Sequence, residues 1–477
     1  MVSSNDVIDT DYHHRIPHSN VDETVALLGS GSSTSSSASS RGSRRFGLVG
    51  FMIALVVLSS STFLFFMNKQ QGTPISSSSS MEVPSETSLI RSVSGLDDSG
   101  DAKQTKSKKS PIDDDDSRFV PDMWDGDEIG ISSNVCLDDE MKDWHLKFTK
   151  VLDAWDYSQR EGKPSQGEGI VIAQVDSGYS THSCFDSIFT DNNKKGLNYF
   201  DREGWGRSED FNDPKDMSWG PGAGHGTVVA SAAMNRGVNG GPPGTAPKAT
   251  LFSIRVINNP AMIMIDIRRM IRAFDDITTK NNNIHVVSMS LGMASYVTLK
   301  PDLENSIKRA IKAKNLIVVA AAGQLGTSGD AGGGAMNPAR MNDVMAVGGV
   351  FMDNRYFGNR GPRVHIVAPA HNVCNAQSNS FGTNPNAYGP GQGTSIATAM
   401  TGGIAALWLA HHGRDYLIRE FSAIGRTLNE AFMKVVEKTA QKPDGWPQRQ
   451  GYGIIDALAI LEMDVSTIKM YLQEDSS

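Results

Sequence analysis

From about Trp144 onward the sequence alternates short apolar runs with longer stretches of helical spacing, and this alternation limits what the chain can fold into. The runs that predict buried parallel strands are Gly169–Val175, Ala249–Val256, Ile284–Leu291 and Asn315–Ala322. The stretches that predict helices are Ile263–Ile277, Asp302–Lys314, Thr394–His411 and Leu428–Thr439. Strands that alternate with helices predict an α/β fold: a doubly wound, mostly parallel sheet with helices on both faces.

Three motifs fall at boundaries of these elements, where a doubly wound sheet presents its functional groups. Asp176 ends the first expected strand, and His225 stands between two glycines ahead of a predicted helix, Val228–Asn235. Ser395 opens a helix of small residues. Each motif alone has an ordinary structural interpretation, as a turn residue, a packed histidine or a helix start. In the order Asp, His, Ser, and each at an element boundary, the three together indicate a catalytic site.

The chemistry of a serine nucleophile explains these residue types. A serine hydroxyl is a poor nucleophile until a neighbouring imidazole accepts its proton, and that imidazole needs a carboxylate on its other nitrogen. A serine at a helix N-terminus also has free backbone N–H groups beside the developing oxyanion. The pattern therefore predicts Ser395 as the nucleophile, His225 as the general base and Asp176 as the carboxylate that orients His225.

Further segments in the same order resemble the subtilisin-like (subtilase) serine peptidase family, over roughly Trp144–Leu461. Besides the three motifs, the matching segments are Ser288–Gly292, Val318–Gly326, Asn337-Pro338, Ala346–Gly348 and Gly451–Ala457. Subtilisins carry their triad in the order Asp, His, Ser. The resemblance implies a subtilisin-like fold and a serine-type endopeptidase, which hydrolyses peptide bonds in proteins or peptides through an acyl-enzyme on Ser395.

The resemblance also implies where substrate binds. The two strand edges that would flank the first specificity pocket are Ser290, Leu291 and Gly292 on one side and Ala321, Ala322 and Gly323 on the other. An extended substrate would add to both edges through main-chain hydrogen bonds. Leu325 and Met336 are expected at the rim and base of this pocket, and the peptide bond before Pro338 is expected to be cis. Because neither pocket residue is acidic, we expect an apolar residue before the scissile bond.

The residue expected to supply the side-chain donor of the oxyanion hole departs from the family pattern. Relatives carry Asn there, whereas this chain carries Gln324. Gln keeps the amide N–H donor, but its extra methylene displaces that donor by on the order of 1 Å. Complete loss of such a donor costs about 10²–10³ in kcat. We therefore expect a displaced donor that works beside the backbone N–H of Ser395.

Metal binding is not required by this chemistry, and no cofactor is expected. Val238 lies in the loop Asn235–Gly244 where many relatives carry a calcium-ligating Asn, so calcium is not expected in that loop; calcium elsewhere stays open and unassigned. The cysteines Cys136, Cys184 and Cys374 form no CxxC or Cys/His pattern, which argues against a zinc site. One disulfide with one free thiol allows three pairings, and three unpaired thiols are an equal alternative.

Two function classes fit the motifs. The first is the active serine endopeptidase, and the alternative is a catalytically silent subtilase-fold protein that binds peptides or acts as a scaffold. Gln324 and the lack of a recognisable folded pro-segment suggest the alternative. An α/β-hydrolase would need the motif Gly-x-Ser-x-Gly and the order Ser, Asp, His along the chain. This chain lacks both, which argues against that class. A net charge of −8 without a basic stripe interleaved with aromatics argues against nucleic-acid binding, and the sequence specifies no oligomeric state.

The N-terminal part has a different composition. Residues 1–45 are polar and predict a disordered cytoplasmic tail, and residues 46–67 are an uncharged apolar run long enough for a transmembrane signal-anchor. Basic residues concentrate before this run, which predicts a single-pass type II topology with the catalytic part lumenal or extracellular. Glu23–Leu28 resembles an acidic dileucine signal for endosomal or vacuolar membranes. Residues 68–143 are expected to form a stalk or pro-region, 144–463 the peptidase domain and 464–477 a tail.

Overall fold

The structure, a computed structural model, describes residues 135–189, 191, 194–199, 212–216, 224–257, 267–280, 283–293, 301–324, 334–359, 361, 363–377, 384, 386–447 and 450–475. The predicted cytoplasmic tail, the predicted span at 46–67 and almost all of the predicted stalk lie outside these residues. Among the described helices, none combines the length and the apolar character that a membrane crossing requires.

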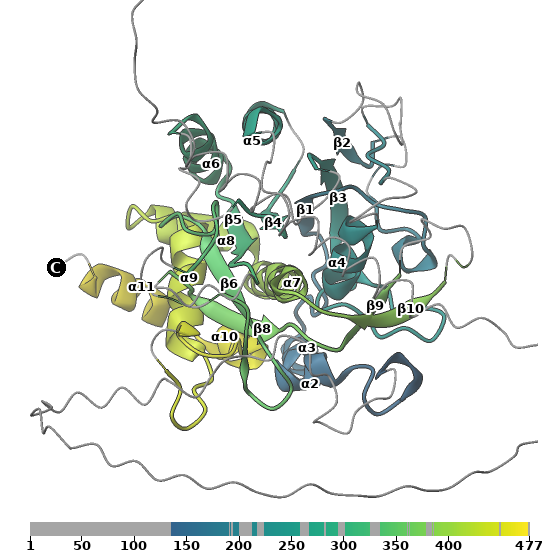
Figure 1. The fold of residues 1–477 in the computed structure, drawn as a ribbon. Helices are drawn as coiled ribbons and strands as arrows, with labels where there is room; N and C mark the ends of the chain where they lie inside the picture. Colours follow the sequence, from purple (N-terminus) through teal and green to yellow (C-terminus); the bar gives the residue numbers. More distant parts are fainter. Residues whose placement is uncertain are drawn as a thin grey trace, which may run out of the picture. The chain divides into compact units, whose positions relative to one another are not determined.

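One sheet organises the described part of the chain (Figure 1). Its strands are β1 (Val171–Asp176), β2 (Gly196–Asn198), β3 (Thr250–Arg255), β4 (Val286–Met289), β5 (Ile317–Ala321), β6 (Met345–Val350), β7 (Tyr356–Phe357) and β8 (Ile366–Pro369). The order is β2-β3-β1-β4-β5-β6-β7, with β8 also paired to β6. All pairings are parallel except that of β6 with β7. A separate antiparallel hairpin joins β9 (Val373–Ala376) to β10 (Tyr388–Gly391).

Helices cover both faces of the sheet. They are α2 (Trp144–Phe148), α3 (Val151–Arg160), α4 (His225–Met234), α5 (Ile267–Thr279), α6 (Pro301–Lys314), α7 (Thr394–His412), α8 (Arg414–Ser422), α9 (Leu428–Thr439), α10 (Ala457–Glu462) and α11 (Val465–Glu474), with short 3₁₀ turns at Val135–Leu137 and Ser183–Phe185. In Figure 1, α5 and α6 lie on one side of the sheet and α4 and α7 on the other. The predicted α/β fold with a mostly parallel sheet is confirmed.

Burial on both faces explains the unbroken apolar runs in the strands. Along β1, Ile172 packs into the core beneath α4 and α7, whereas Ala173 and Val175 pack into the core beneath α5 and α6. All six residues of β1 are buried. A strand covered on both faces has no solvent side, so the apolar and polar alternation of half-exposed strands is lost.

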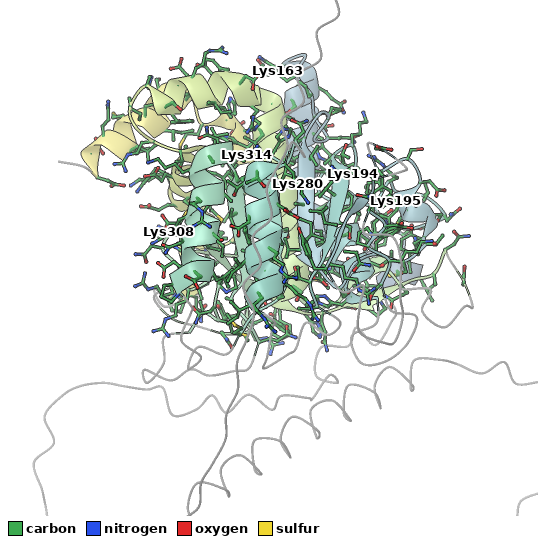
Figure 2. The ribbon with its side chains drawn as sticks, turned by 90° about the horizontal axis from the view of Figure 1, so that it is seen from above. Lys163, Lys194, Lys195, Lys280, Lys308 and Lys314 are labelled. Carbon is green, nitrogen blue, oxygen red and sulfur yellow. A yellow bond between two sulfur atoms is a disulfide. The ribbon has the colours of Figure 1, made fainter. Side chains whose placement is uncertain are left out.

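The solvent-facing surface of the helices α5 and α6 is polar. Figure 2 shows α5 and α6 side by side, with Lys308 and Lys314 on α6 and Lys280 just beyond α5. Lys308 pairs with Glu304 one turn earlier, at 2.7 Å. An exposed pair of this kind stabilises a helix by only a few tenths of a kcal/mol. The buried apolar side of α6 therefore accounts for most of the free energy with which this helix packs on the sheet.

Helix α7 runs through the centre of the other layer and is buried along nearly its whole length. Its small residues permit this close approach. A Cβ atom at Gly403 would lie 1.9 Å from Thr245 Oγ1, and one at Gly402 would lie 3.4 Å from Ser288 Cβ. Gly403 therefore allows α7 to pack against the segment between α4 and β3, while Gly402 faces the sheet at Ser288 on β4.

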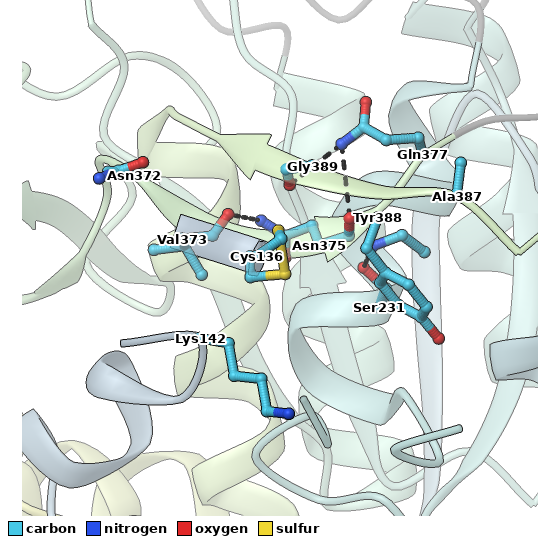
Figure 3. The surroundings of a disulfide bond; sticks show 12 residues. Cys136, Lys142, Ser231, Asn372, Val373, Asn375, Gln377, Ala387, Tyr388 and Gly389 are labelled. Carbon is cyan, nitrogen blue, oxygen red and sulfur yellow. Dashed lines mark hydrogen bonds between the residues drawn. A yellow bond between two sulfur atoms is a disulfide. The ribbon is translucent and has the colours of Figure 1, made fainter. Parts of the chain in front are cut away.

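The folded body extends beyond both ends of the domain expected at 144–463. At the N-terminal side, Val135 is fully buried and Cys136 forms a disulfide with Cys374 on β9 (Figure 3). At the C-terminal side, α11 takes the place of the expected tail, and its residues Ile468 and Leu472 pack into the core. Both segments are too short to show strong periodicity, and tertiary contacts stabilise them.

The pairing of Cys136 with Cys374 resolves the alternatives that the three cysteines left open. The remaining Cys184 is a buried thiol, and burial raises its pKa well above the ordinary value. A buried thiol of this kind is inert. The disulfide ties the segment before α2 to the β9–β10 hairpin.

Candidate active site

Asp176 ends the central strand at the topological switch point of the sheet. β3 lies on one side of β1 and β4 on the other, and ligands of doubly wound sheets bind where the connections diverge in this way. The Asp176 side chain is fully buried. Its Oδ1 accepts the Ser177 N–H at 2.7 Å, and its Oδ2 lies 3.4 Å from the donor Nε2 of Gln174. These two donors hold the carboxylate of Asp176 in place at the end of β1.

His225 is the first residue of α4, three residues earlier than the predicted start of that helix. Its Nδ1 lies 2.7 Å from Oδ1 of Asp176. Gly226 is required here, because a Cβ atom at that position would lie 2.0 Å from the carbonyl oxygen of Gly178. The imidazole is 19% exposed, and among the described residues no group hydrogen-bonds its Nε2. The carboxylate thus holds one imidazole nitrogen and leaves the other available.

Ser395 is the second residue of α7. At this position the backbone N–H has no carbonyl one turn earlier in the helix to which it could donate. The Ser395 hydroxyl donates to the carbonyl of Ser290 at 3.3 Å, and the Ser290 hydroxyl donates to the carbonyl of Ser395 at 2.8 Å. Within the described residues, no hydrogen bond joins Ser395 to His225. Catalytic hydrogen bonds are often long without substrate and tighten when it binds.

Gln324 lies against the start of α7. The backbone N–H of Thr394 donates to Gln324 Oε1 at 3.1 Å. Because the carbonyl oxygen of the amide accepts this bond, the amide NH₂ is left as a donor beside Ser395. The contact also requires glycine at Gly393, where a Cβ atom would lie 2.9 Å from Gln324 Oε1 and φ is 136°.

The predicted substrate edges follow neighbouring parallel strands. Ser290, Leu291 and Gly292 continue β4, while Ala321 ends β5 and is followed by Ala322 and Gly323. The backbone of Gly323 has φ of 101°, a conformation that favours glycine. The structure thus brings the two segments together at the carboxyl edge of the sheet, beside Ser395.

Met336 lies between these two edges. A Cβ atom at Gly323 would lie 2.3 Å from Met336 Sδ, and one at Gly292 would lie 3.0 Å from Met336 Cβ. The Met336 N–H donates to the carbonyl of Ala322 at 2.9 Å. The Asn337-Pro338 bond that follows is cis, as expected. Leu325, expected at the rim of the pocket, lies outside the described residues.

Sequence reasoning missed two residues that hold this region. Asn359 donates its backbone N–H to the carbonyl of Gly323 at 2.9 Å and its Nδ2 to the carbonyl of Ala322 at 3.1 Å. Asp216 accepts the N–H of Gly224 at 2.6 Å, directly before His225. Neither residue ends a strand or opens a helix, so the boundary rule that found the other side chains gave no signal for them.

The loop Asn235–Gly244, where calcium was not expected, makes hydrogen bonds within the protein. The carbonyl of Val238 accepts the Tyr388 hydroxyl at 2.9 Å and the Gly241 N–H at 3.1 Å. The side-chain oxygen of Asn235 accepts the Gly237 N–H at 3.0 Å. Among the described residues there is also no cluster of three His, Cys, Asp or Glu that could hold a metal.

The order of the site residues along the chain and their meeting at one sheet edge agree with what family comparison finds. The sequence model of the Subtilase family matches residues 167–453, more than half of the chain. This chain belongs to the subtilase family. The predicted family is thereby confirmed, and the match contains all three residues of the predicted triad.

Curated relatives are bacterial proteases. The chain is 27% identical to the major intracellular serine protease of Bacillus subtilis (strain 168), over 62% of this chain and 81% of that protein. It is 30% identical to subtilisin Savinase of Lederbergia lenta, over 55% of this chain and 86% of that protein. With the thermostable alkaline protease of Halalkalibacterium halodurans it shares 36% identity, over 39% of this chain and 46% of that protein.

Proposed function

We propose that this chain is a serine endopeptidase that hydrolyses peptide bonds through an acyl-enzyme on Ser395. The enzyme class follows from the family and from relatives named as serine proteases. The observation that carries the residue assignment is the 2.7 Å hydrogen bond between His225 Nδ1 and the buried carboxylate of Asp176. It fixes the imidazole tautomer with its proton on Nδ1, so that Nε2 can accept the proton of a serine hydroxyl.

The first step forms a bond between Ser395 Oγ and the carbonyl carbon of the substrate. For this, the Ser395 hydroxyl turns from the carbonyl of Ser290, to which it donates at 3.3 Å, toward His225 Nε2. Nε2 takes the hydroxyl proton and passes it to the leaving nitrogen as the peptide bond breaks. Water then attacks the acyl-enzyme with His225 as base, which releases the acid product and restores the Ser395 hydroxyl.

The negative charge on the carbonyl oxygen would be stabilised by two donors. One is the backbone N–H of Ser395 in the first turn of α7, where the helix dipole adds favourable potential. The other is the amide NH₂ of Gln324, which the Thr394 N–H holds by the opposite end of the amide at 3.1 Å. An anchored donor needs no reorganisation in the transition state, and this compensates in part for the longer side chain.

We further propose a preference for a small apolar residue before the scissile bond. Met336 occupies space between the edges 290–292 and 321–323, with its sulfur 2.3 Å from where a Gly323 Cβ would lie. Met336 thereby places an uncharged thioether where a substrate side chain between the two edges would come into contact. A small apolar side chain would contact the thioether, which is polarisable and adapts to irregular partners.

The direct test of the proposed function is labelling of the full-length chain with a fluorophosphonate, which reacts only with an activated serine. Labelling should occur in the wild type and vanish in Ser395→Ala and in His225→Ala. Ser231→Ala, which removes a buried hydroxyl elsewhere on α4, serves as a matched control and should label normally. A folded wild-type chain that does not label would contradict the proposal.

The catalytically silent, peptide-binding alternative has one observation in its favour. The Ser395 hydroxyl is directed at the carbonyl of Ser290 and not at His225. In a silent protein this arrangement would persist when peptide binds, and the edges would hold the peptide without cleaving it. A wild-type chain that binds a peptide but releases it intact would favour this alternative.

For its location we propose a single-pass type II membrane protein with the peptidase domain lumenal or extracellular. The support is the apolar run at 46–67 and the basic residues that precede it. Glycosylation sequons introduced into residues 68–143 should be used in cells. Unmodified sequons in an otherwise glycosylation-competent cell would contradict this topology.

A further inference from the structure

The backbone on both sides of His225 is held by two side chains that the proposed chemistry does not use. The Gly224 N–H donates to Oδ2 of Asp216 at 2.6 Å, and the Gly226 N–H donates to Oγ of Ser177 at 3.0 Å. The Ser177 hydroxyl donates in turn to the same Oδ2 of Asp216, at 2.9 Å. Ser177 and Asp216 are thus linked to each other and to the residues before and after His225.

Ser177 also joins this pair to the carboxylate partner of the histidine. It directly follows Asp176, and its N–H donates to Asp176 Oδ1 at 2.7 Å, the same oxygen that His225 Nδ1 approaches. The Ser177 residue is completely buried. One rigid turn after β1 therefore holds the imidazole through Asp176 and the following backbone through Ser177.

Hydrogen bonds from other segments also hold the backbone around Asp216. Its N–H donates to the carbonyl of Tyr179 at 2.7 Å, and the Tyr179 N–H donates to the carbonyl of Pro214 at 3.1 Å. From the end of β3, Arg255 Nη1 donates to the carbonyl of Lys215 at 2.6 Å. Arg255 is only 1% exposed. Burial lowers the pKa of Arg255, and the negative charge of Asp216 opposes this shift.

We propose that Ser177 and Asp216 are positioning residues that set the direction of the His225 imidazole. This inference rests on the proposed function, because it assigns the pair a role in the proton transfers that His225 performs. Neither side chain touches the reacting atoms. They hold the first turn of α4, so that Nε2 faces both the Ser395 hydroxyl and the leaving nitrogen. A displacement of about 1 Å in such a group can cost roughly 10²-fold in rate.

The test compares an amide with an ester substrate in the full-length chain. Ser177→Ala removes the acceptor of the Gly226 N–H and a donor to Asp216. The kcat for a peptide p-nitroanilide with Ala before the scissile bond should fall by about 10²-fold at unchanged KM. The matching p-nitrophenyl ester should lose much less, since its leaving group needs no proton from His225. Ser177→Thr keeps the hydroxyl and should restore most of the amide activity.

A second variant, Asp216→Asn, keeps the shape of the side chain and so tests the inference even if Ser177→Ala impairs folding. Asp216→Asn keeps an acceptor for the Gly224 N–H and removes the charge, so it should shift the amide-to-ester ratio in the same direction by a smaller factor. The control is Ser231→Ala on the same helix, whose hydroxyl donates to the carbonyl of Val228 at 2.7 Å and accepts the Ala376 N–H at 3.0 Å. It should lower thermal stability and leave that ratio unchanged.

The outcomes separate this inference from the function on which it rests. An active wild type whose Ser177→Ala and Asp216→Asn variants keep the wild-type amide-to-ester ratio would overturn the positioning role alone. A wild type that hydrolyses neither substrate and is not labelled by a fluorophosphonate would overturn the proposed function and the positioning role together. A shifted ratio in both variants, restored in Ser177→Thr, supports the inference.

Discussion

Two histidines lie at opposite ends of the same parallel strands, and their surroundings differ. At the carboxyl end, His225 Nδ1 is 2.7 Å from the carboxylate of Asp176, and Nε2 has no hydrogen-bond partner among the described residues. At the amino end of β4, His285 accepts the Val171 N–H on Nδ1 at 3.1 Å and reaches Oδ1 of Asn283 with Nε2 at 3.2 Å. His285 is 6% exposed, and its burial lowers its pKa to about 4.

The contrast separates the histidine proposed as general base from one with a structural role. His285 is neutral, with both nitrogens engaged by neutral groups, and it supplies the acceptor that the first residue of β1 would otherwise lack. His365 does the same for Ala346 at the start of β6, at 2.9 Å. His225 instead has a charged partner on one nitrogen and leaves the other available, which a general base requires.

The largest expected effect comes from removing each histidine in turn. His225→Ala should lower kcat/KM for a peptide substrate by about 10⁴–10⁶-fold with little change in stability. His285→Ala should leave kcat unchanged and destabilise the fold by about 1–3 kcal/mol, because the Val171 N–H loses its acceptor. Steady-state kinetics and urea unfolding of both variants check this. A large loss of kcat in a well-folded His285→Ala variant would contradict the purely structural role of His285.

The next effect concerns the amide NH₂ of Gln324, the proposed side-chain donor at the carboxyl end of the strands. Gln324→Ala should lower kcat by about 10²–10³-fold at unchanged KM, since it removes the proposed side-chain donor to the oxyanion. Gln324→Asn should raise kcat if the extra methylene displaces the donor. A fall in kcat for the Asn variant would mean that the site is built around the longer side chain, as the Thr394 contact suggests.

Acid should affect the structural histidines. Burial lowers the folded-state pKa to about 4 for His145, His285, His365 and His412. Between pH 6.5 and 4 the unfolded chain binds protons that the folded chain does not, so stability should fall as the pH falls through this window. Each histidine contributes about 1.4 kcal/mol per pH unit there, and nothing above pH 6.5.

Urea unfolding at pH 7.0, 6.0 and 5.0 measures this slope. The matched comparison is His285→Ala, which lacks one of the four groups and should show a shallower decline with falling pH. A decline as steep as that of the wild type would show that His285 is protonated in the folded protein, and the contrast with His225 would fail.

The smallest effect tests the second contact of His285. Asn283 has φ of 50°, so Asn283→Gly removes the side chain without adding backbone strain. Loss of the hydrogen bond to His285 Nε2 should destabilise the fold by about 0.5–1.5 kcal/mol and leave kcat unchanged. Thermal unfolding with parallel kinetics decides this, and unchanged stability would mean that solvent replaces the Asn283 contact.

Some parts of the fold and of the candidate site could be predicted from the sequence, and others could not. Strands buried on both faces left unbroken apolar runs, so β1, β3, β4 and β5 were found within about two residues. Asp176, His225 and Ser395 were predicted as the triad because each stands at an element boundary, and the structure places all three at one edge of the sheet. α11, the disulfide partner of Cys136 and the loop residue Asp216 carried no local signal, since contacts with distant segments determine them.

The sequence by itself determined the alternation of strands and helices and the residue types needed for serine-protease chemistry, because backbone periodicity and side-chain reactivity are local properties. Only the tertiary structure decided that Cys136 pairs with Cys374, that Met336 lies between the segments 290–292 and 321–323, and that the Tyr388 hydroxyl donates to the carbonyl of Val238. These outcomes depend on which atoms meet within a few ångströms across the fold. The separation of two residues along the chain does not tell whether their atoms are in contact in the folded protein.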